Sequence, residues 1–141
     1  GDCNVARSWM WAAVRCGFEL RVATPEKFRP SRIESVAISG NVKVVVDPLE
    51  AARGADVLYT DVWVSMGKED EAAFRLAQFR NYQINHALLS VAPGALVLHC
   101  LPAYRGKEIT KEVFEEHAAT IFRQAENRLH TQKAILSLVA A

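Results

Sequence analysis

The stretch VLYTDVWVSMG, residues 57–67, constrains the fold of this chain more than any other. Its apolar start gives way to polar residues at Asp61, and a short apolar run with polar ends is typical of a buried parallel strand. In open α/β sheets, ligands bind just beyond the carboxyl ends of the strands. Asp61 is therefore expected to face a ligand, and Ser65 and Met66 occupy the loop behind it.

A second stretch, LVLHCLP at residues 96–102, has the same arrangement. It places His99, Cys100 and Leu101 at the end of another predicted strand. We predict that these two strand ends and the segment that follows Gly1 together build one polar pocket for a small charged metabolite.

Strand and helix patterns alternate along the whole chain, which predicts an α/β fold: a three-layer, Rossmann-like domain with a mainly parallel sheet flanked by helices. A turn before a helix in such a chain normally follows a strand, so we expect a first strand ahead of Gly1 that this chain lacks. Without an internal repeat or a linker, residues 1–141 are predicted to form one domain. Strand patterns cover 18–23, 42–46, 57–61, 96–100 and a short extended piece at 121–122, and helical patterns cover 5–16, 47–53, 68–79, 85–91, 110–115 and 124–139, with a weaker one around Ile33, Val36 and Ala37.

Composition excludes several classes of protein. The 141 residues carry a formal net charge of +1, so there is no electrostatic signature of binding to nucleic acid or to an anionic membrane. No apolar run approaches the roughly 20 residues of a membrane helix, and no signal peptide is visible. The three cysteines lack CxxC spacing, which argues against a disulfide framework or a zinc site and fits a reducing compartment.

Each candidate residue also has a purely structural interpretation. Asp61 fits an N-cap or turn residue, and Asn4 fits the N-cap of the first helix. Cys100 is more often a buried small apolar side chain than a reactive group, and His99 is more often a core histidine with its hydrogen bonds satisfied. Arg128, expected near a helix start, fits a solvated charge. The prediction of a site depends on three strand-to-helix junctions that share one sheet edge.

Several motifs resemble the carboxyl-terminal, ornithine-binding half of the ornithine carbamoyltransferases: DVWVSMG, HCLPAYRG and FRQAENRLHTQKA. GDCNVARSWM is similar to the first turn and helix of that half, although the turn DCN is shorter than is usual in the family. The resemblance covers residues 1 to about 138, and the SMG loop distinguishes the ornithine branch from the aspartate branch.

The resemblance assigns roles to individual positions. Cys100 and Leu101 are expected to line the place where the δ-amino group of ornithine meets the carbamoyl carbon, and Arg128 is expected to reach carbamoyl phosphate; Cys100 and Arg128 are thus the catalytic candidates. The residues expected to hold the α-amino and α-carboxylate groups of L-ornithine are Asn4, Asp61, Ser65 and Met66.

The resemblance further implies a transferase of arginine metabolism, in biosynthesis or the urea cycle, without cofactor or metal, trimeric and cytoplasmic or in the mitochondrial matrix. The family's phosphate-binding segment belongs to an amino-terminal domain that nothing here resembles, so this chain is expected to be inactive alone. Two other readings compete: a non-catalytic or engineered amino-acid-binding module that self-associates, and a nucleotide-binding Rossmann half. The chain has no GxGxxG fingerprint, which argues against the nucleotide-binding reading.

Overall fold

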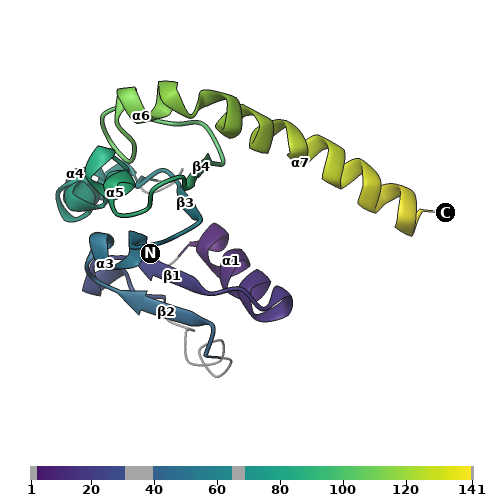
Figure 1. Cartoon of the computed structure of the whole chain (residues 1–141), viewed down its shortest axis with the longest axis horizontal. Coiled ribbons are helices and arrows are strands. Elements are labelled where there is room, and N and C mark those ends of the chain that lie inside the picture. The colour runs from purple at the N-terminus through teal and green to yellow at the C-terminus, as the bar shows by residue number, and fades with distance from the viewer. Residues whose placement is uncertain (1–2, 31–39, 65–68, 141) are drawn as a thin grey trace.

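The computed structural model describes residues 3–30, 40–64 and 69–140, in which helices alternate with parallel strands (Figure 1). The predicted α/β class is confirmed. Within these ranges, single-turn 3₁₀ helices cover Glu26–Phe28, Glu69–Glu71 and Arg80–Tyr82. The other elements are α1 (Asn4–Cys16), β1 (Leu20–Ala23), β2 (Val42–Val45), α3 (Pro48–Ala52), β3 (Val57–Thr60), α4 (Ala72–Phe79), α5 (His86–Ser90), β4 (Leu96–His99), α6 (Lys111–Glu116) and α7 (Ala118–Val139).

Local sequence sets both ends of α1. The Sγ atom of Cys3 accepts a hydrogen bond from the backbone N–H of Ala6 at 3.4 Å, so Cys3 is the N-cap. Asn4 is the first helical residue, and its interpretation as the N-cap is wrong. At the other end Gly17 takes a φ of 76°, a left-handed conformation that glycine adopts without a Cβ penalty. Polar residues at the predicted starts of three later helices cap those helices with their side chains: Asp47, Asn85 and Thr110.

The strands form two parallel pairs. β1 pairs with β2 from Leu20 opposite Val42 onward, and β3 pairs with β4 from Val57 opposite Leu96 onward. In the described part of the chain the two pairs are not joined into one hydrogen-bonded sheet. Figure 1 shows β1 and β2 with α1 and α3 in one half of the molecule, and β3 and β4 with α5 and α6 in the other.

The core is divided in nearly the same way, except that Ala52 of α3 belongs to the larger cluster. The larger cluster surrounds β4 and joins α5, α6 and the start of α7, and Val97, Val113 and Ile121 in it are fully buried. A smaller cluster of Met10, Ala13 and Val42 lies between α1 and the β1–β2 pair. β4 is thus buried at the centre of the larger half, as continuous apolar runs of parallel strands usually are.

Helix α7 differs from its prediction. It begins at Ala118, so the expected extended piece at Ile121 and Phe122 is wrong, and Arg128 lies within the helix instead of near its start. Ile121 is buried against the core, whereas Leu129 and Leu138 on the predicted apolar stripe are exposed. Figure 1 shows the carboxyl-terminal half of α7 extending away from the other elements.

No helix in the described ranges combines the length and the apolar character needed to cross a bilayer. The predicted short helix around Ile33, Val36 and Ala37 lies outside the described residues, as do Ser65 and Met66.

The burial of Ile121 leads to a prediction about how α7 is held. Replacing Ile121 by alanine removes buried methylene groups and leaves a cavity, so we expect the free energy of unfolding to fall by about 2–5 kcal/mol. The matched control, Leu136→Ala on the same helix, removes an exposed side chain and should change it by less than about 0.5 kcal/mol. Urea titrations of both variants measure the difference, and equal effects would contradict the described packing of α7.

Candidate functional site

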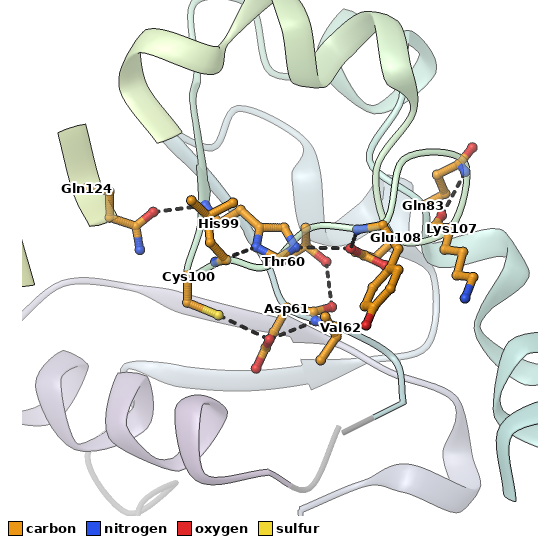
Figure 2. A network of polar contacts seen from close by, with 11 residues as sticks. Thr60, Asp61, Val62, Gln83, His99, Cys100, Lys107, Glu108 and Gln124 are labelled. Carbon is orange, nitrogen blue, oxygen red and sulfur yellow. Dashed lines mark hydrogen bonds and ion pairs between the residues drawn. The ribbon is translucent and has the colours of Figure 1, made fainter. Parts of the chain in front are cut away.

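Asp61 and Cys100 meet at the carboxyl edge of the β3–β4 pair. Thr60 lies opposite His99 in the register, so the next residue of each strand leaves the sheet at the same place. The Cys100 thiol donates a hydrogen bond to Oδ1 of Asp61 at 3.1 Å (Figure 2). The backbone N–H of Val62 donates to the same oxygen at 2.7 Å. The prediction that these two strand ends share one rim of the fold is confirmed.

The surroundings of Cys100 keep its thiol protonated. Burial raises the pKa of Cys100 to about 11, and the hydrogen bond to the Asp61 carboxylate acts in the same direction. Burial and a hydrogen bond with Cys100 also raise the pKa of the neighbouring Tyr59 hydroxyl. At neutral pH the pair is therefore a neutral thiol that donates to an acceptor, and the thiol is no nucleophile, because only the thiolate attacks.

A buried pair supports the backbone that follows Cys100. Nδ1 of His99 accepts a hydrogen bond from the backbone N–H of Leu101 at 2.9 Å, and its Nε2 lies 3.2 Å from Oε1 of Glu108 (Figure 2). Because Nδ1 is an acceptor here, the ring proton lies on Nε2 and is donated to Glu108. Both side chains are almost completely buried. His99 is therefore a core histidine with its hydrogen bonds satisfied, and it also fixes the turn that carries the candidate site.

Two details show how tightly this turn is constrained. Leu101 has a φ of 57°, which is uncommon for a residue with a branched side chain, and its bond to Pro102 is cis. Glu108 Oε1 also accepts from the backbone N–H of Tyr104, while Glu108 Oε2 is buried without a hydrogen-bond partner among the described residues. An unpaired buried carboxylate oxygen is costly, so the contacts of Oε1 must offset that cost.

Helix α7 is anchored to the same strand end. The side chain of Gln124 accepts a hydrogen bond from the backbone N–H of His99 at 2.8 Å (Figure 2). Arg128 follows one helical turn later, so it shares a helix face with Gln124, and it is exposed. Its exposed position fits a solvated charge, and it also fits a side chain that binds a ligand.

The amino-terminal candidate lies at the start of α1. Asn4 is exposed, and within the described residues it makes no hydrogen bond with Asp61 or Cys100. One link between the two regions is aromatic: the ring of Trp9 on α1 lies edge-on to Tyr59 on β3, with centroids 5.2 Å apart. The structure thus brings Asp61, Cys100 and Leu101 together, whereas Asn4 and Arg128 are exposed side chains without a hydrogen bond to Asp61 or Cys100 among the described residues.

Sequence reasoning missed three residues of this network: Tyr59, Glu108 and Gln124. Tyr59 lies inside an apolar strand pattern, which predicts a strand but gives no role to its hydroxyl group. Glu108 lies in a loop without periodicity, and no local signal marks it as buried. Gln124 was assigned to a helix, yet its hydrogen bond spans 25 positions, which no local pattern reports.

The chain belongs to the carbamoyltransferases, as a member of the family described as "Aspartate/ornithine carbamoyltransferase, Asp/Orn binding domain", whose profile matches residues 1–139. The relatives it resembles are ornithine carbamoyltransferases. That of Akkermansia muciniphila is 50% identical over 142 residues, covering 99% of this chain and 47% of the relative. The anabolic enzyme of Pseudomonas aeruginosa is 51% identical over 138 residues, covering 96% of this chain and 45% of the relative.

Solved structures of ornithine carbamoyltransferases also match this chain. The anabolic ornithine carbamoyltransferase of Campylobacter jejuni superposes with a TM-score of 0.88 at 40% identity, over 94% of this chain and 46% of that protein. The enzyme of Pyrococcus furiosus gives a TM-score of 0.84 at 44% identity, over 95% and 45%. This chain therefore spans less than half the length of the proteins it matches.

The thiol–carboxylate contact leads to a prediction about reactivity. Asp61→Asn removes a negative charge that raises the pKa of Cys100, while the effect of burial stays. Each unit by which that pKa falls raises the thiolate fraction roughly tenfold at pH 8. We expect Cys100 in this variant to react several-fold faster with iodoacetamide, as followed by peptide mass spectrometry.

The exposed Cys16 provides the reference rate within the same chain. Asp56→Asn is the matched control, because Asp56 is an exposed carboxylate just before β3. It should leave the reaction of Cys100 unchanged. An unchanged rate at Cys100 in Asp61→Asn, or an equal rise at Cys16, would refute the electrostatic coupling.

Proposed function

We propose that this chain is the ornithine-binding half of an ornithine carbamoyltransferase. The whole enzyme would transfer the carbamoyl group of carbamoyl phosphate to the δ-amino group of L-ornithine, giving L-citrulline and phosphate. The observation that carries the proposal is the contact between Asp61 and Cys100 at the carboxyl edge of two parallel strands, in a chain of this family. Ligands of open α/β folds bind at that edge.

Asp61 is the proposed partner of the α-ammonium group of ornithine. Both hydrogen bonds that the Asp61 side chain accepts from the described residues use Oδ1, so among these residues Oδ2 is the oxygen left to accept from a cation. A charge-assisted hydrogen bond of this kind is about twice as strong as a neutral one. We infer that Asn4, Ser65 and Met66 complete the recognition of the amino-acid head.

Cys100 and Leu101 line the proposed place of reaction. The neutral δ-amine forms a bond to the carbamoyl carbon, the bond from that carbon to the phosphate oxygen breaks, and the nitrogen loses a proton. This direct transfer needs orientation and stabilisation of the oxyanion more than a protein nucleophile. The raised pKa of Cys100 fits a residue that lines the site without attacking the substrate, because the neutral thiol is a poor nucleophile and its one proton is donated to Asp61.

The site for carbamoyl phosphate is proposed to be shared with the part of the enzyme outside this chain. The relatives are more than twice as long as the matched region, which leaves room for a second domain. The exposed guanidinium of Arg128 on α7 is the group proposed to reach the phosphate, because Arg binds phosphate through two parallel hydrogen bonds.

Assembly and location follow from the resemblance. We infer a homotrimer, as the family resemblance implies, and a role in arginine biosynthesis, which the anabolic names of two relatives support over the urea cycle. A cytoplasmic location is favoured over the mitochondrial matrix, because bacterial relatives are about 50% identical whereas the mitochondrial enzyme of Coccidioides immitis is 28% identical.

A second candidate function is a self-associating module without catalysis. The exposed apolar residues of the carboxyl-terminal half of α7 favour it, because large exposed apolar patches often mark interaction sites. These residues are Leu129, Ile135, Leu136, Leu138 and Val139.

A binding measurement tests the proposed role of Asp61. We expect the chain to bind norvaline, which has the amino-acid head of ornithine, weakly, and we expect Asp61→Asn to weaken this binding at least tenfold. Hydrogen bonds to charged groups contribute about 1.5–3 kcal/mol, which corresponds to that loss. NMR titration of labelled protein gives the dissociation constants. Asp56→Asn should bind like the unchanged chain, and absence of binding in the unchanged chain would favour the self-associating module.

A chimeric enzyme tests the proposed role of Arg128. The chain alone should form no citrulline above background from carbamoyl phosphate and ornithine. Joined to the amino-terminal half of the Akkermansia muciniphila relative, it should become active, and Arg128→Lys should lower kcat/KM of the chimera at least tenfold because lysine loses the paired hydrogen bonds. Arg123→Lys, an exposed arginine of the same helix, should change it little. Citrulline formed by the chain alone, or equal effects of both substitutions, would contradict the proposal.

A further inference from the structure

The register of β3 and β4 places the side chains of Tyr59, Asp61 and Cys100 on one face of the strand pair. Side chains alternate between the two faces along a strand, so residues two positions apart share a face. Tyr59 therefore shares its face with Asp61. Leu98 lies opposite Tyr59 in the register and shares that face with Cys100. His99 points to the other face, where it is fully buried.

Packing holds the ring of Tyr59 in place beside the thiol. The side chain of Tyr59 is half-buried, and the ring of Trp9 on α1 lies edge-on to it. A tyrosine in such surroundings usually gives its hydroxyl group a hydrogen-bond partner. Two polar side chains lie within hydrogen-bonding reach of this hydroxyl, those of Cys100 and Gln124.

The other contacts of these side chains decide which way each hydrogen bond runs. Oε1 of Gln124 accepts from the backbone N–H of His99, so the amide NH₂ is the end of that side chain that is left to face Tyr59. An NH₂ group only donates, so the Tyr59 oxygen accepts from it. The single thiol proton of Cys100 is donated to Asp61, so the sulfur can only accept from Tyr59. The hydroxyl proton of Tyr59 therefore points at the sulfur.

The hydrogen bonds of these four side chains consequently run in one direction, and we call the set the Tyr59 network. The Gln124 amide donates to the Tyr59 hydroxyl, and this hydroxyl donates to the Cys100 sulfur. The Cys100 thiol in turn donates to the Asp61 carboxylate, where the network ends because a carboxylate only accepts. Hydrogen bonds arranged in series polarise one another, which strengthens each of them.

The pKa directions agree with this order. Burial is the main cause of the raised pKa of both Cys100 and Tyr59, but the hydrogen bonds add effects of opposite sign. The bond between the two residues raises the pKa of Tyr59 and lowers that of Cys100, as expected when the hydroxyl is the donor. The bond with Gln124 lowers the pKa of Tyr59, as expected when the amide donates to it.

We propose that Tyr59 is a positioning residue of the site, whose hydroxyl group, oriented by Gln124, holds the Cys100 thiol so that its proton points at Asp61. On the proposed function, this arrangement fixes the carboxylate that binds the α-ammonium group of ornithine. Tyr59 thus acts through Cys100 and Asp61 and does not touch the substrate. Without the hydroxyl group, the sulfur has no donor beside it, and the thiol can turn away from the carboxylate.

Alkylation of Cys100 tests the direction of the network. Tyr59→Phe keeps the ring that packs against Trp9 and removes the hydroxyl group, whose hydrogen bond lowers the pKa of Cys100. We expect Cys100 to react with iodoacetamide about three to ten times more slowly at pH 9 than in the unchanged chain, because the thiolate fraction falls. Peptide mass spectrometry measures the rate. A substitution that merely loosened the packing would expose the thiol and speed the reaction.

Tyr82→Phe is the matched control. The Tyr82 hydroxyl donates to the carbonyl of Val46 at 2.7 Å, just beyond β2, so its loss should leave the rate at Cys100 unchanged. The exposed Cys16 again gives the reference rate in every variant. Faster reaction of Cys100 in Tyr59→Phe, or equal slowing in Tyr82→Phe, would overturn the proposal.

A double-mutant cycle tests the part that Gln124 plays. Gln124→Met keeps the length of the side chain and removes the amide, so Cys100 should react more slowly, by a smaller factor than in Tyr59→Phe. In the Tyr59→Phe background the same substitution should change the rate little, because Gln124 acts on Cys100 through the hydroxyl group. The single variant leaves the Tyr59 ring unchanged, so it decides the matter even where Tyr59→Phe lowers stability. An unchanged or faster rate in Gln124→Met, or an equal effect in both backgrounds, contradicts the network.

A norvaline titration separates this proposal from the proposed function. Tyr59→Phe should weaken norvaline binding about two- to tenfold, as the loss of one hydrogen bond does, whereas Tyr82→Phe should not. Equal affinities of Tyr59→Phe and the unchanged chain would overturn the positioning role. The alkylation rates need no ligand. The expected rates in a chain that binds no norvaline would therefore support the Tyr59 network and contradict only the proposed function.

Discussion

The hydrogen bond between the Cys100 thiol and the Asp61 carboxylate depends on the register of one parallel strand pair. Because Thr60 lies opposite His99, the two following residues leave the sheet side by side. A shift of one residue in either strand would turn these side chains to the other face and separate them. The register is itself fixed by the apolar residues of β4, since Val97 is fully buried in the larger core. The packing of the core and the chemistry of the site therefore share one cause.

Beneath this contact, a buried polar pair positions the backbone. His99 and Glu108 are removed from water, and a buried charge is tolerated only when it is paired. Their contacts hold the N–H of Leu101, whose left-handed conformation directs the chain away from the sheet. Local backbone strain of this kind is common where a site must be held in one geometry. The buried pair thus acts on the site through the backbone, without reaching the position proposed for the ligand.

Two surfaces of the described residues have no covering element. In the described ranges four strands form two pairs, whose inner edges face a cavity, and such edges are normally paired or covered. The exposed apolar residues at the end of α7 are a second surface without a covering element in the described residues. The relatives named above are more than twice as long as the region they share with this chain.

Sequence by itself determined the elements whose signals are local. The helices predicted at 5–16 and 47–53 lie close to those bounds, with Gly17 after the first and Asp47 capping the second. Apolar runs bounded by polar residues located β3 and β4, so that Asp61 and Cys100 were expected at one edge. Only the tertiary structure decided which polar residues support that edge. Glu108 and Gln124 act through contacts across 9 and 25 positions, and periodicity reports only near neighbours. The extended piece predicted at residues 121–122 became part of α7 for the same reason: burial of Ile121 against the core favours a helix there, and that core is assembled from distant segments.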